Sequence, residues 1–70
     1  MRTNGYRSGK TIIAILSAIG VVTRGQPVCF ITTQNPEMFE GVFRDECPTG
    51  TRIETVTKDG CSHITLTPAA

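Results

Sequence analysis

The side chains best suited to metal binding are three cysteines and the single histidine. Thiolates and imidazole nitrogens are the usual Zn²⁺ ligands, and together these four would form a Cys₃His set. Cys61 and His63 lie two positions apart, so on a strand they share one face. No paired C-x-x-C spacing is present, and Cys29 lies in an apolar run, where a buried thiol is common. The pattern favours ordinary thiols, with a metal site formed by Cys29, Cys47, Cys61 and His63 as the open alternative.

Residues 7–11 read Arg-Ser-Gly-Lys-Thr, which matches the end of a phosphate-binding P-loop. That motif requires an earlier glycine that follows a strand, so that backbone N–H groups can surround the phosphates. The required position holds Asn4 instead, Gly5 is one place out of register, and the three residues before Asn4 are too few for a strand. We therefore expect no nucleotide hydrolysis, no catalytic residue, no cofactor and no small-molecule substrate. A helix beginning at Ser8 could still bind a phosphate oxygen at its N-terminus.

Residues 9–43 also resemble the opening of helicase-like P-loop enzymes, with residues 28–33 in the place of the second strand. Such enzymes hold Mg²⁺ with an acid at the end of a later apolar strand. No later apolar run of this chain ends in Asp or Glu, and the chain is far shorter than a working ATPase of that kind.

The charged residues are separated along the chain. Arg2, Arg7 and Lys10 fall within the first ten residues, and residues 35–46 carry four acids against one arginine. A basic segment can neutralise phosphates, whereas an acidic helix is repelled by a duplex and suits a basic protein surface. The DNA-binding candidates are Arg2, Arg7, Lys10, Arg52 and Lys58. The partner-binding candidates are Glu37, Glu40, Arg44, Asp45 and Glu46. A solvated helix face is the simpler explanation of the second group.

Length and composition limit the fold to one small domain. A chain of 70 residues buries only about 60% of the surface that its unfolded form exposes, so its stability is expected to be marginal. The longest apolar run, residues 12–22, is about half of the roughly 20 residues that a membrane span needs. The odd cysteine count, without an export signal, predicts reduced thiols and a cytoplasmic location.

Two helices are expected from capping residues and apolar spacing. The first is predicted over 8–24, with Ser8 as N-cap, Gly25 as the stop and a buried stripe consisting of Ile12, Ile15, Leu16, Ile19 and Val22. Residues 1–7 are then a short basic arm. The second begins at Asn35-Pro36-Glu37 and ends before Pro48 and Gly50, with Met38, Phe39, Val42 and Phe43 facing the core. Residues 28–33 fit either a buried strand or a helical turn.

The remaining residues predict a β-hairpin. Asp59-Gly60 is a type I′ turn signal between β-rich segments, and a two-residue turn pairs Lys58 with Cys61. In that register, Ile53, Thr55, Ile64 and Leu66 share the face that packs on the helices, while Arg52, Glu54, Val56, Cys61 and His63 share the other.

The expected order of elements is helix, short apolar segment, helix and hairpin, and the last strand ends in Ile64-Thr65-Leu66-Thr67-Pro68. This arrangement is similar to a winged helix-turn-helix domain. The resemblance implies an α+β fold over residues 8–70, with two or three short helices packed on a C-terminal hairpin that serves as the wing. It also implies a non-enzymatic transcription regulator that binds DNA through the basic arm and the wing. The acidic helix, in the place of the recognition helix, departs from that pattern. The alternative is a phage-type inhibitor or adaptor that binds a host protein through this helix. A homodimer is left open in either case.

Overall fold

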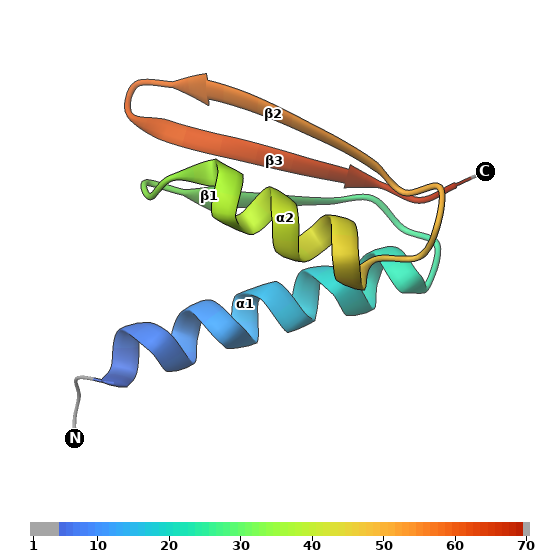
Figure 1. The fold of residues 1–70 in the computed structure, drawn as a ribbon, viewed down its shortest axis with the longest axis horizontal. Helices are drawn as coiled ribbons and strands as arrows, with labels where there is room; N and C mark the ends of the chain where they lie inside the picture. Colours follow the sequence, from blue (N-terminus) through green and yellow to red (C-terminus); the bar gives the residue numbers. More distant parts are fainter. Residues whose placement is uncertain (1–4, 70) are drawn as a thin grey trace.

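The computed structural model describes the backbone of residues 5–69 and the side chains of residues 12–69. The elements follow the order α1 (Gly5–Thr23), β1 (Val28–Thr32), α2 (Pro36–Glu46), β2 (Arg52–Lys58) and β3 (Cys61–Thr67). The three strands form one antiparallel sheet in the order β1-β3-β2, and both helices lie to one side of it (Figure 1). The expected α+β class is confirmed. Residues 28–32 are a strand, which decides the choice that the sequence left open.

The helix α1 is longer than predicted and begins at Gly5 rather than at Ser8. Residues 5–7 therefore belong to the helix and not to a basic arm. Serine costs less than about 0.7 kcal/mol in a helix interior, and no proline interrupts these residues, so the helix continues past the predicted cap. Of the predicted arm, residues 1–4 lie outside the described residues.

The end of α1 was predicted correctly and has Schellman geometry. The N–H of Gly25 bonds to the carbonyl of Val22 at 3.0 Å, and the N–H of Gln26 bonds to the carbonyl of Val21 at 3.2 Å. Gly25 has a φ of +89°, a conformation that an L side chain rarely adopts. The glycine therefore turns the chain out of the helix and toward β1.

The helix α2 has the predicted caps. The Asn35 side chain accepts a hydrogen bond from the N–H of Glu37 at 3.0 Å, and Pro36 occupies the first helical position. The N–H of Cys47 bonds to the carbonyl of Phe43 at 2.8 Å and closes the helix. These caps fix the helix ends independently of its packing.

The core lies between the sheet and the two helices. The ring of Phe30 on β1 packs against Phe39 and Phe43 of α2, with ring centroids 4.9 and 5.3 Å away. The other buried apolar side chains come from α1 and β3: Ala18, Val22, Ile64 and Leu66. The hairpin register was predicted correctly in every pair, from Lys58–Cys61 to Ile53–Leu66.

Three predicted core residues are exposed instead. Ile12 and Leu16 of α1 and Met38 of α2 are more than half exposed, whereas Ile15, Ile19 and Val22 pack as predicted. The start of α1 diverges from the sheet (Figure 1), so apolar residues there have no neighbouring element to pack on, whereas Leu16 lies farther along the helix on a side that is exposed. Met38 lies on the side of α2 away from Phe39 and Phe43. On α1, Ala18 is buried in the core, although the prediction did not include it among the core residues.

Candidate interaction surfaces

The outward face of α2 carries acids around an exposed methionine. Glu37, Met38, Arg44 and Asp45 are exposed at the helical spacing i, i+1, i+7 and i+8, opposite the buried phenylalanines. We call these four residues the outer α2 surface. Met38 is 57% exposed. A flexible thioether amid charges is a type of side chain that adapts to different partners.

Glu40 and Glu46 differ from the residues of the outer α2 surface. Glu40 is half-buried, and its Oε2 accepts a hydrogen bond from the hydroxyl of Thr55 on β2, so it attaches the helix to the hairpin. Glu46 is exposed in the last turn, beside Cys47. Burial, and secondarily the charge of Glu46, raise the pKa of the Cys47 thiol. Of the five predicted partner-binding residues, the structure thus places Glu37, Arg44 and Asp45 on one exposed face.

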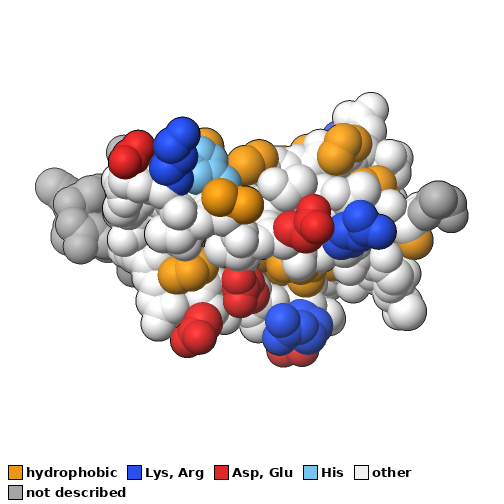
Figure 2. Space-filling model, turned by 90° about the horizontal axis from the view of Figure 1, so that it is seen from above, with side chains coloured by type: hydrophobic (Ala, Val, Ile, Leu, Met, Phe, Trp, Pro, Cys, Tyr) orange, Lys and Arg blue, Asp and Glu red, His pale blue; other side chains and the backbone are white. Residues whose placement is uncertain are grey.

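The hairpin does not concentrate positive charge. Arg52 and Lys58 are exposed at opposite ends of β2, about 20 Å apart at the rise of a strand. Glu54 lies between them, and Asp59 occupies the turn. Figure 2, which views the molecule from above Figure 1, shows the two signs of charge interspersed. The hairpin by itself is therefore a weak phosphate-binding surface.

The described residues do not bring the N-terminal cations and the hairpin cations together in a single basic patch. Arg2 lies outside the described residues, and for Arg7 and Lys10 the structure describes only the backbone, which belongs to α1. Figure 1 shows the start of α1 and the hairpin on opposite sides of the molecule, with α2 and β1 between them. In addition, residues 9–11 are inside a helix, where backbone N–H groups bond to preceding carbonyls rather than to a phosphate.

The metal-ligand candidates are divided between two sides of the sheet. Cys29, Cys61 and His63 are on strand positions that face away from the helices, whereas Cys47 packs against the core at the end of α2. Among the side chains of residues 12–69, no three Cys, His, Asp or Glu groups are close enough to hold a metal ion. The described helices include none that is long and apolar enough to cross a membrane.

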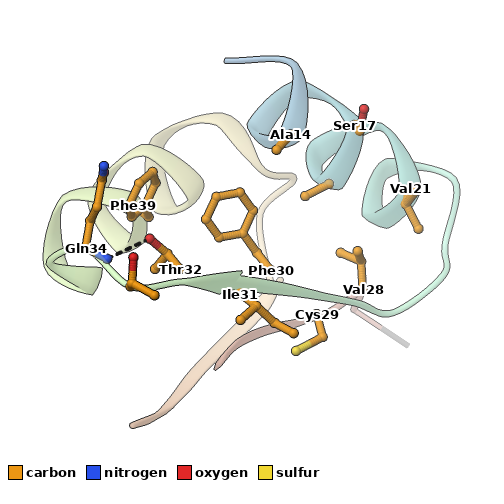
Figure 3. A pocket seen from close by; sticks show the side chains of 12 residues that line it. Ala14, Ser17, Val21, Val28, Cys29, Phe30, Ile31, Thr32, Gln34 and Phe39 are labelled. Atoms are coloured by element: carbon orange, nitrogen blue, oxygen red, sulfur yellow. Dashed lines mark hydrogen bonds between the residues drawn. The ribbon is translucent and has the colours of Figure 1, made fainter. Parts of the chain in front are cut away.

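A groove of about 560 Å³ runs between α1 and β1, and the sequence analysis did not identify it (Figure 3). Ala14, Ser17 and Val21 line it from α1, and the rings of Phe30 and Phe39 point into it. The signal that could have revealed it is the complete absence of charged residues over 25–36, which include β1, the loop after it and the loop before it except Arg24.

No protein-family model, curated protein or solved structure matches this chain. The interpretation of these surfaces therefore rests on their geometry and charge.

Proposed function

We propose that this protein is a non-enzymatic regulatory module that binds a basic surface of another protein through the outer α2 surface. The observation that carries this proposal is the exposure of Glu37, Met38 and Asp45 on one face of a helix that is anchored by its opposite face. The caps and the buried phenylalanines hold the helix in place, so little ordering is required when a partner binds. An inhibitor or adaptor, including one of the phage type, acts in this way.

The position of the acids supports the same proposal. Asp45 and Glu46 occupy the last turn of α2. The negative end of the helix dipole lies there, so carboxylates at these positions destabilise the helix. Residues that oppose local stability are often found at functional sites. A basic partner bound to the outer α2 surface would offset the repulsion that Asp45 produces.

The experiment is an NMR titration of the ¹⁵N-labelled protein with a lysine- and arginine-rich peptide. We expect amide shifts concentrated in residues 36–46, and weaker binding by the double variant Glu37→Gln, Asp45→Asn. The matched control is Glu54→Gln together with Asp59→Asn, which changes the net charge equally but on the hairpin. Equal weakening by both double variants would show only a net-charge effect and would reject the outer α2 surface as the binding site.

A second candidate function is DNA binding through the N-terminal cations, as in a transcription regulator of the winged-helix type. It is favoured by the charge separation: residues 1–10 contain three of the seven cations and no acid, and the rest of the chain contains four cations and all six acids. In this proposal the N-terminal cations make the phosphate contacts without the hairpin, because Arg52 and Lys58 lie on the opposite side of the molecule (Figure 1), and the carboxylates of α2 are repelled by the duplex.

The test of DNA binding uses substitutions, because deletion of residues 1–7 would remove the first turn of α1. We expect the triple variant Arg2→Gln, Arg7→Gln, Lys10→Gln to bind duplex DNA more weakly and with a shallower dependence on salt concentration. The variant Glu37→Gln, Asp45→Asn is the comparison and should bind DNA at least as well as the parent. If instead the α2 variant lost DNA affinity and the triple variant retained it, α2 would be the DNA-binding element.

A further inference from the structure

The two edges of the sheet are protected very differently. Within the described residues, β1 pairs only with β3 and so presents unpaired N–H and C=O groups along its other side. Proteins usually prevent such an edge from binding another strand by placing charges or proline on it. The opposite edge strand, β2, carries Arg52, Glu54 and Lys58. β1 carries neither a charge nor a proline between Val28 and Thr32.

The groove lies along this unprotected edge. It is lined by consecutive residues of β1, both those that face the helices, such as Phe30, and those that face away, such as Cys29 and Ile31. A cavity can touch both kinds of residue only at the edge of a strand, where the backbone itself is accessible. A strand that pairs with β1 would therefore extend the sheet directly beside an open apolar groove.

The helix beside the groove also leaves apolar side chains uncovered. α1 packs mainly against β1 and also against β3, whereas α2 packs against β2, β3 and Phe30 of β1. Ile13 and Leu16 of α1 are 65% and 61% exposed, and the side of α1 toward the groove carries the small side chains of Ala14 and Ser17. Small side chains allow a second helix to approach closely. The edge strand and the residues that line the groove are uncharged, and Ile13 and Leu16 of α1 continue this apolar surface as far as Arg24.

We propose that two copies of this chain pair through antiparallel β1 strands, which makes a continuous six-stranded sheet with the two α1 helices side by side. A two-fold axis at the strand pair keeps the helices of both copies on the same face of the sheet and joins the two apolar grooves. This proposal goes beyond the function proposed above, because the outer α2 surface lies on the side of the helix opposite Phe39 and Phe43 and takes no part in lining the groove, so it stays free.

Two observations favour a second copy over an unrelated peptide. The absence of charge over residues 25–36 gives the edge no means of selecting a charged peptide, whereas two copies of the edge can meet without repulsion between like charges and exchange backbone hydrogen bonds about a two-fold axis. Among the side chains of residues 12–69, seven apolar ones are buried in the core of a single copy, with five more packed partly buried against them. Oligomerisation is one of the usual ways in which so small a domain completes its core.

The experiment is sedimentation equilibrium of the full chain up to about 1 mM, a concentration that reveals even millimolar association. The test variant is Ile31→Lys, which introduces the charge that edge strands normally carry. Its control is Val56→Lys: Ile31 and Val56 are 59% and 63% exposed and lie on either side of His63, on the two opposite edges of the sheet. Since both side chains point away from the core, both variants should fold, and circular dichroism verifies this.

We expect a dimer for the parent, a dissociation constant raised about tenfold or more by Ile31→Lys, and no comparable change with Val56→Lys. Amide hydrogen exchange in residues 28–32 should become slower as the protein concentration rises. A parent chain that remains monomeric at the highest concentration would overturn the proposal. So would a dimer that Ile31→Lys does not weaken, or one that both variants weaken equally, which would place the interface on the outer sheet face.

Discussion

Thr55 of β2 donates a hydrogen bond from its hydroxyl group to Oε2 of Glu40 on α2. This bond joins the second helix to the hairpin fifteen positions along the chain, at a half-buried place between the two elements. The bond also distinguishes Glu40 from Glu37, Asp45 and Glu46 of the same helix, whose side chains are exposed. Glu40 is therefore a structural residue of the domain, although its residue type and spacing are the same as those of a binding acid.

Removal of the donor should destabilise the domain. In Thr55→Val the shape of the side chain is kept, but the half-buried carboxylate of Glu40 loses its partner, so the free energy of unfolding should fall by about 1–3 kcal/mol. Urea denaturation monitored by circular dichroism measures this change. The control is Thr67→Val, at an exposed position of β3. An equal loss in both variants would mean that the Thr55–Glu40 bond contributes nothing specific.

Truncation of Leu66 should have a larger effect. Its side chain is fully buried between Val28 and Ile53, its partners on the two flanking strands. We expect Leu66→Ala to lower the free energy of unfolding by about 2–5 kcal/mol, which is a large part of the stability of so small a domain. Thr67→Ala, one position along the strand and exposed, should melt close to the parent. Similar melting of both variants would contradict the side-chain alternation described for β3.

Two glycines should respond to alanine in opposite directions. Gly50 has a φ of +94°, and a Cβ atom there would lie 2.9 Å from the Cβ of Ala69. Gly50→Ala should therefore reduce stability by about 1–2 kcal/mol. Gly41 lies inside α2 and a Cβ atom there would meet nothing within 4 Å, so Gly41→Ala should stabilise the domain by about 0.5–1 kcal/mol. Thermal unfolding measures whether each variant melts below or above the parent protein.

Cys47 should make stability depend on alkaline pH. Burial, with a smaller contribution from Glu46, raises the pKa of its thiol above the ordinary value of 9.0. A group whose pKa is raised in the folded state stabilises fully below its unfolded pKa, and this contribution is lost as the pH rises through the folded pKa. Unfolding free energies measured from neutral pH to above pH 9.0 should therefore decline. The decline should be smaller in Cys47→Ala, and an identical decline would exclude this thiol as its source.

The hairpin and α2 were predictable from sequence because local chemistry determines them. Asp59-Gly60 fixes the turn, the turn fixes the register, and Asp59 adopts the positive φ that such a turn requires. Asn35-Pro36 likewise starts α2 without help from the rest of the chain. In both places the residues that specify the structure lie within a few positions of it.

The start of α1, the strand at 28–32 and the exposure of Met38 depend instead on tertiary context. Residues 28–32 are a strand because β3 lies beside them, and no local signal reports the presence of β3. Apolar spacing predicted burial for Leu16, but burial also requires an element on that side of the helix. The groove was missed for the same reason, since it arises where α1 and β1 meet.

The central strand of the sheet is also the last strand along the chain. During synthesis on a ribosome, α1 and β1 are complete long before β3 exists, because Val28 and its partner Leu66 are separated by more than half the chain. The hairpin can form quickly once its turn is made, whereas the addition of β1 must close a long loop. The uncharged β1 segment therefore waits without its partner for longer than any other strand, and unpaired segments of this kind are prone to aggregate. Refolding of the denatured chain should therefore lose more protein to aggregation as its concentration rises, and a charge placed on β1 by Ile31→Lys should reduce that loss.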